Sequence, residues 1–77
     1  MKPVCDLKKG LIFGDIITDK EKETFYRFLH YNNEELFKPA QCEKLEKVKC
    51  GEHDFILVST HEEITLSRFE TNMLYLY

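Results

Sequence analysis

The spacing of hydrophobic and polar residues changes several times along the chain, and two stretches have the pattern of strands. Residues 11–17 (LIFGDII) are aliphatic and aromatic, which is typical of a strand. Gly14 within this stretch indicates a bulge or a close approach of another backbone segment. Residues 54–60 (DFILVST) form a continuous apolar run bounded by polar residues, which predicts a central strand.

A helix is predicted between these two strands, over residues 19–31. Thr18 and Glu21 match the S/T-x-x-E capping box, in which each side chain binds the backbone of the other residue. Three apolar residues then follow at i, i+3 and i+4 and would form one stripe on the helix: Phe25, Phe28 and Leu29.

The segment after this helix contains weaker signals. Residues 34–38 would form one more helical turn, with Asn33 as its cap, and Pro39 would end it. Residues 44–50 are mixed and charged, and we interpret them as an exposed strand. Residues 51–53 (GEH) would then be the turn of a hairpin that leads into the strand at 54–60.

The last seventeen residues fit two different patterns. Thr60 to Glu63 again matches a capping box, and several apolar residues beyond it lie at helical spacing. Apolar and polar residues also alternate, however, and residues 70–72 make a plausible turn. We favour two strands joined by that turn, with a single helix as the alternative.

These elements predict one small α+β domain over residues 1–77, with one main α-helix (19–31) packed on an antiparallel sheet of four to five strands. A chain of 77 residues buries only about 60% of its unfolded surface, so its core is thin. Most of its apolar residues are needed for that core. We therefore do not expect a large enclosed substrate cavity.

Charge and cysteine content narrow the functional classes. The net charge is −3, and residues 50–77 carry five carboxylates against the single cation Arg68. This acidic third is typical of a solvated surface and could also face a basic partner. Three cysteines, an odd number, indicate a cytoplasmic protein rather than a secreted disulfide-linked one. The longest apolar runs are far too short to cross a bilayer, so no membrane partner is expected.

The stretch CGEHD at residues 50–54 raises the question of a metal site. Cys50 and His53 are spaced as zinc ligands, and Cys42 precedes them, so a zinc-stapled module is one alternative. Structural zinc sites are usually built from two such short-spaced pairs, and only one is present here. A hairpin turn with Gly51 at positive φ is the simpler interpretation. We therefore expect no metal ligands and no cofactor.

Two other classes have little support in the sequence. No nucleophile–base pair and no phosphate-binding loop can be recognised, so we expect no enzymatic activity. Lys44, Lys47 and Lys49 are the main basic group, and their acidic neighbours disfavour nucleic acid as a partner. A weak nucleic-acid-binding domain remains an alternative function.

The C-terminal segment NMLYLY gives the best indication of a binding surface. As a strand, it would place Met73, Tyr75 and Tyr77 on one face and Leu74 and Leu76 on the other. One helix covers only one of these faces, and an unpaired strand at a chain end can pair with another chain. We predict an interaction surface made of six residues: Met73, Tyr75, Tyr77, Glu62, Glu63 and Glu70.

The general profile is a short single domain with many aromatic residues and no signal segment or catalytic motif. It resembles the small accessory proteins of phages and mobile elements, which act by binding and blocking a larger protein. This resemblance implies no role for individual residues. We therefore expect a small non-enzymatic binding protein, whose partner is another protein or a second copy of the chain.

Overall fold

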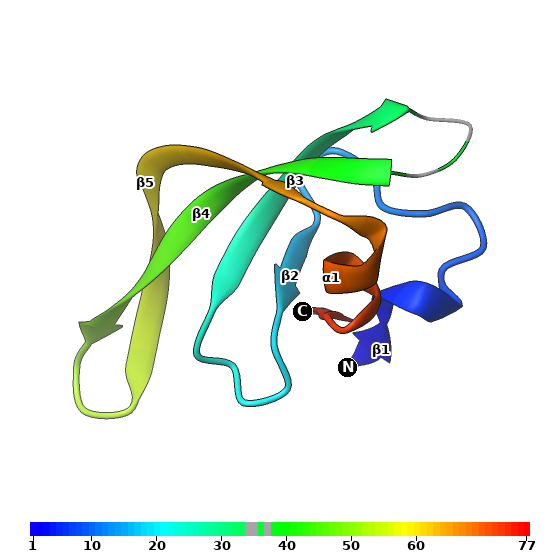
Figure 1. Ribbon diagram of the computed structural model, residues 1–77. Coiled ribbons are helices and arrows are strands. Elements are labelled where there is room, and N and C mark those ends of the chain that lie inside the picture. Colours follow the sequence, from blue (N-terminus) through cyan, green and yellow to red (C-terminus); the bar gives the residue numbers. More distant parts are fainter. Residues whose placement is uncertain (34–35, 37) are drawn as a thin grey trace.

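The computed structural model describes residues 1–33, 36 and 38–77, and most of them belong to one antiparallel sheet with strand order β1-β6-β2-β3-β4-β5 (Figure 1). The strands are β1 (Lys2–Pro3), β2 (Ile16–Thr18), β3 (Phe25–Asn33), β4 (Lys38–Cys50), β5 (Asp54–Leu66) and β6 (Tyr75–Leu76). A single turn of 3₁₀-helix, η1 (Val4–Asp6), follows β1, and the short helix α1 (Arg68–Asn72) precedes β6. In the part of the chain that is described, no helix is long and apolar enough to span a bilayer.

The predicted main helix at 19–31 is wrong, because residues 25–33 form strand β3. The start of that segment is a turn closed by Asp19, whose carboxylate accepts hydrogen bonds from the backbone N–H groups of Glu23 (2.8 Å) and Thr24 (3.2 Å). Thr18 does not cap a helix, since its hydroxyl donates to the carbonyl of Thr24 at 2.8 Å. The predicted fold class is therefore also wrong. Across the described residues, the protein is mostly a six-stranded antiparallel sheet with one short helix.

The predicted strand at 11–17 is shorter and later than expected, since β2 covers only residues 16–18. The residues before it form a turn, in which the Asp15 carboxylate accepts from the Ile12 backbone N–H at 2.9 Å. The close backbone approach expected at Gly14 is present: its N–H donates to the Phe28 carbonyl at 2.9 Å, and its φ is +92°.

The hairpin in the second half of the chain was predicted well. Residues 44–50 lie in β4, residues 54–60 lie in β5, and Gly51 between them has a φ of +88°. The prediction that 54–60 is a central strand is wrong, because β5 lies at the edge of the sheet. The helical turn predicted at 34–38 lies outside the described residues, apart from Leu36 and Lys38.

The C-terminal segment combines the two patterns that the sequence allowed. Residues 64–66 and 75–76 are strands, as favoured, but residues 70–72 belong to helix α1 instead of a turn. This helix begins with a true capping box. The Ser67 hydroxyl accepts from the Glu70 N–H, and the Glu70 carboxylate accepts from the Ser67 N–H, both at 3.1 Å.

Side chains are buried on both faces of the sheet. The main core lies on the face that η1 and α1 cover, and its buried members are Val4, Leu11, Ile17, Phe28, Ala40, Cys42 and Leu66. A smaller cluster lies on the opposite face, where Phe25 and Leu45 are buried next to each other on β3 and β4. Strand β3 thus contributes buried side chains to both faces of the sheet. A surface helix at this position would bury only one of its faces.

The three thiols should differ sharply in reactivity. Cys42 is fully buried in the main core, and burial raises its pKa to about 12, whereas Cys5 and Cys50 are exposed. The thiolate is the reactive species. With iodoacetamide at neutral pH, mass spectrometry should show two labelled cysteines in the folded protein and three after denaturation. Labelling of all three at similar rates would contradict the placement of Cys42.

Candidate interaction surface

The sheet face opposite the main core carries a set of aromatic and apolar side chains, which we call the aromatic face. Strand register places its residues in rows, since Tyr75 lies opposite Thr18, Thr18 opposite Phe25, and Phe25 opposite Leu45. Side chains two residues apart on a strand share a face. The aromatic face consists of Phe25, Leu45, Phe55, Leu57, Tyr75 and Tyr77.

Phe25 is the centre of this face, and two other rings pack against it. The Tyr77 ring meets it edge-on, with centroids 5.2 Å apart and an angle of 87° between the planes. The Phe55 ring lies 5.9 Å away at 43°. Phe25 is only 1% exposed as a result, while Tyr77 remains 52% exposed. Tyr77 is therefore a fixed ring that still offers most of its outer surface to a partner.

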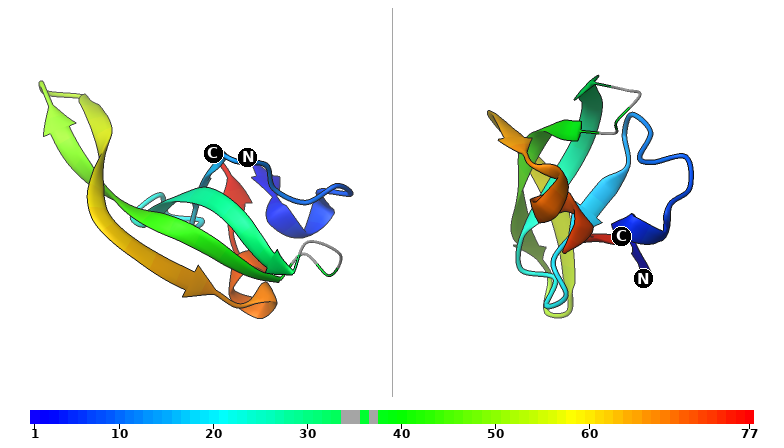
Figure 2. Two further views of the ribbon diagram at one scale, coloured as in Figure 1. Left: turned by 90° about the horizontal axis from the view of Figure 1, so that it is seen from above. Right: turned by 45° about the vertical axis from the view of Figure 1, so that its right-hand side comes forward.

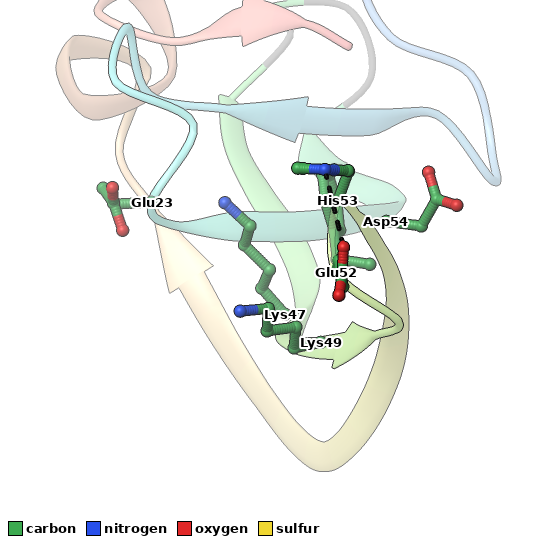
Figure 3. A pocket seen from close by; sticks show the side chains of 7 residues that line it. Glu23, Lys47, Lys49, Glu52, His53 and Asp54 are labelled. Atoms are coloured by element: carbon green, nitrogen blue, oxygen red, sulfur yellow. Dashed lines mark ion pairs between the residues drawn. The ribbon is translucent and has the colours of Figure 1, made fainter.

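A groove of about 420 Å³ adjoins this face, between the β2–β3 turn and the tip of the β4–β5 hairpin (Figure 3). Its lining residues are Glu23, Lys47, Lys49, Glu52, His53, Asp54 and Phe55. The Lys47 ammonium lies 4.6 Å from the centroid of the Phe55 ring, a cation–π contact. Three carboxylates face two ammonium groups here, so the groove has no excess of positive charge for a phosphate.

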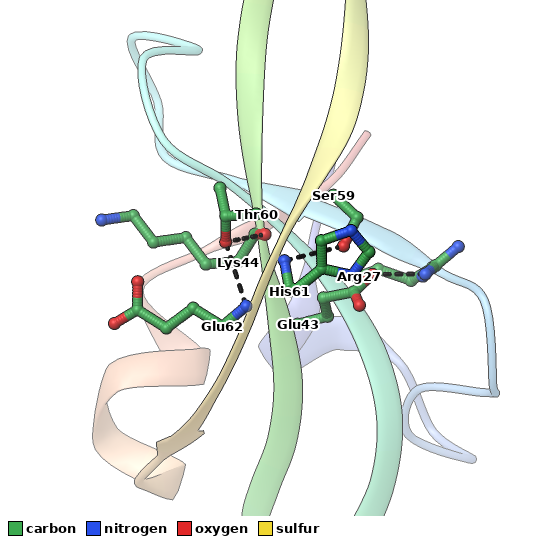
Figure 4. A network of polar contacts seen from close by, with 7 residues as sticks. All are labelled: Arg27, Glu43, Lys44, Ser59, Thr60, His61 and Glu62. Atoms are coloured by element: carbon green, nitrogen blue, oxygen red, sulfur yellow. Dashed lines mark hydrogen bonds and ion pairs between the residues drawn. The ribbon is translucent and has the colours of Figure 1, made fainter.

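A bulge marks the other border of the aromatic face (Figure 4). Glu43 pairs with Glu63 and Leu45 with Ser59, so three residues of β5 lie opposite Lys44 alone. The Thr60 hydroxyl donates to the Lys44 carbonyl at 2.8 Å and accepts from the Glu62 N–H at 3.2 Å. His61, in the middle of the bulge, has a φ of +60°. These bonds fix a sharp local bend in β5.

An ion pair between Arg27 and Glu43 lies beside the bulge, on the same face as Phe25. A hydrogen bond from the Ser59 hydroxyl and the neighbouring Arg27 guanidinium together hold the pKa of Glu43 below its ordinary value of 4.5. The Arg27 side chain is 42% exposed and the Glu43 side chain 19%. The pair thus forms a polar border to the aromatic face.

The structure separates the residues that were predicted to form one interaction surface. Tyr75 and Tyr77 lie on the aromatic face, whereas Met73 ends helix α1 and is 65% exposed. The premise of an unpaired C-terminal strand is wrong, because β6 lies between β1 and β2.

The three predicted acidic residues do not adjoin the tyrosines through the sheet. Glu62 and Glu63 are on β5, and β2, β3 and β4 separate that strand from β6. The Glu70 carboxylate caps helix α1. Phe25 and Phe55 were missed, because only the fold brings Phe25 against the rings of both Tyr77 and Phe55.

The three residues considered as zinc ligands lie in different places. Cys42 is in the core, while Cys50 and His53 are at the hairpin tip. Cys50 lies eight positions after Cys42 on β4, which corresponds to roughly 26 Å at the usual rise of a strand. No group of three possible metal ligands occurs among the described residues.

Comparison with known proteins adds nothing to this picture: no protein-family model, no curated protein and no solved structure matches the chain. The residues of the chain and their arrangement therefore carry the functional argument alone.

The Arg27–Glu43 pair should make stability depend on pH in the acid range. A carboxyl whose pKa is lower in the folded than in the unfolded state stabilises the protein above its unfolded pKa, and this contribution is lost as the pH falls through the folded value. In Glu43→Gln, the free energy of unfolding should therefore fall less than in the wild type as the pH is lowered below about 4.5. Urea unfolding at a series of pH values measures this, and Ser59→Ala should act in the same direction. An acid dependence unchanged in Glu43→Gln would rule out this role of the pair.

Proposed function

We propose that this protein is a non-enzymatic binding protein that acts in the cytoplasm by protein–protein contact, as an inhibitor or modulator of a larger partner. The aromatic face is the proposed contact surface. The observation that carries the proposal is Tyr77, which is 52% exposed although its ring is held against the buried Phe25.

The composition of this surface supports a protein partner. Protein interfaces combine aromatic anchors at the centre with a polar, hydrated rim. Here Tyr77 and Phe55 are at the centre, and Lys47 and the Arg27–Glu43 pair surround them. A ring that is already fixed loses little conformational entropy on binding, so more of its contact energy contributes to affinity.

The charge of the chain supports a partner that carries basic groups. Residues 50–77 contain one cation, Arg68, against five carboxylates: Glu52, Asp54, Glu62, Glu63 and Glu70. Glu52 and Asp54 line the groove beside Phe55. Opposite charges at the rim of an interface mainly speed association and select the partner. The same carboxylates disfavour nucleic acid, because they repel phosphates.

Tyr77→Ser should abolish the association while leaving the fold in place. Tagged wild-type and variant proteins are used to capture partners from the native host, and the captured proteins are quantified by mass spectrometry. Because truncation of a tyrosine that anchors the centre of an interface costs about 2 kcal/mol or more, the captured amount of the specific partner should fall by about tenfold or more. Tyr77→Phe, which keeps the ring, should retain most of it.

Phe69→Ser is the matched control, because Phe69 on α1 is 75% exposed and lies outside the aromatic face. It should capture the partner as the wild type does. Circular dichroism of each variant checks that the fold is retained. A partner retained by folded Tyr77→Ser, or lost only in Phe69→Ser, would show that the aromatic face is the wrong surface.

A further inference from the structure

The distal half of the β4–β5 hairpin projects from the body as a two-stranded arm (Figures 1 and 2). Pairing of β4 with β3 ends at Leu45, which lies opposite Phe25. Beyond that point β4 pairs with β5 alone, from Glu46 opposite Val58 to Cys50 opposite Asp54. We call residues 46–58 the arm.

The arm is a weak structure by itself, since an isolated two-stranded hairpin is at best marginally stable in water. It also exposes apolar side chains away from the aromatic face. Val48 and Ile56 lie directly opposite each other there and are 37% and 51% exposed. An additional strand would stabilise the arm and cover part of this surface.

The outer edge of the arm is open to such a strand. In the described part of the chain, β5 pairs only with β4, so every second residue of β5 directs unpaired backbone groups outward. Natural edge strands are usually protected by lysine, proline, inward charges or bulges. Residues 55–59 (FILVS) have none of these, and the bulge begins only at Thr60.

We propose that this edge pairs with the same edge of a second copy, antiparallel and with the two-fold axis at Leu57. The two arms then form one four-stranded sheet in the order β4-β5-β5-β4. On one face, Leu57 lies opposite Leu57 of the second copy, and Phe55 lies opposite Ser59. On the other face, Ile56 lies opposite Val58.

Charge and side-chain matching select this register over its neighbours. With the axis at Leu57, the only charge in the paired segment, Asp54, lies opposite the neutral Thr60. With the axis at Ile56, Asp54 would lie against Val58. With the axis at Val58, Asp54 would lie opposite Glu62, and like charges directly opposite each other destabilise a strand pair. The segment is thus self-complementary about Leu57, which favours a second copy over an unrelated strand.

The proposed dimer borders the aromatic face at Phe55 and Leu57 on β5 but leaves its tyrosines free. Edge pairing uses backbone groups in the plane of the sheet, whereas Tyr77 projects from the sheet at β6. Each copy in the dimer keeps its Tyr77 available.

Sedimentation velocity and native mass spectrometry over a dilution series test this proposal with charged variants at the axis. The wild type should be a dimer that dissociates on dilution. Leu57→Lys and Leu57→Glu should each raise the dissociation constant by about tenfold or more, because two like charges face each other. An equimolar mixture of the two variants should form a heterodimer, since Lys then faces Glu.

Val48→Lys is the matched control, because it adds a charge to the same arm on strand β4, away from the edge, and it should remain a dimer. Recovery of the heterodimer also shows that both Leu57 variants are folded. A monomeric wild type at every concentration would overturn the proposal, as would a dimer that persists in both Leu57 variants. Failure of the mixture to associate would equally overturn it.

Discussion

The rest of the structure depends on strand β4, which pairs with β3 on one side and β5 on the other. Where both partners are present, side chains are buried on both faces, with Cys42 in the main core and Leu45 against Phe25. Where β3 ends, only the hairpin continues. The bulge opposite Lys44 lies close to this boundary and bends β5 there. The chain is thereby divided into a packed body and a projecting arm.

Both candidate surfaces follow from this division. The helical elements cover one face of the body, so the other face is covered only by its own rings and leaves Tyr77 half exposed. The arm extends past β3, so its edge strand has no neighbour on one side. Both surfaces are therefore the ones that we propose for contact with another molecule.

The sequence predicted those parts of the fold that local chemistry decides. Gly51 with its polar neighbours indicated the hairpin turn, and the apolar run at 54–60 indicated a strand.

The main error in the predicted fold arose at Phe25, Phe28 and Leu29, whose spacing fits one face of a helix. In the structure Phe25 and Phe28 are buried on opposite faces of β3, and a register shift follows Phe28. Similarly, the S/T-x-x-E pattern occurs at Thr18, Ser59, Thr60 and Ser67. Among the described residues only Ser67 caps a helix, because the other three lie in strands. Of the six residues of the aromatic face, the alternation at the C-terminus named only Tyr75 and Tyr77, because the contact of Tyr77 with Phe25 depends on strand register.

Amide hydrogen exchange along strand β4 tests the division into body and arm most directly. At a concentration low enough to keep the chain monomeric, amides of residues 46–50 should exchange much faster than the hydrogen-bonded amides of residues 40–45, because a two-stranded ribbon opens locally at little cost in free energy. Equal protection along the whole of β4 would contradict the account, since it would mean that the arm is as firmly packed as the body.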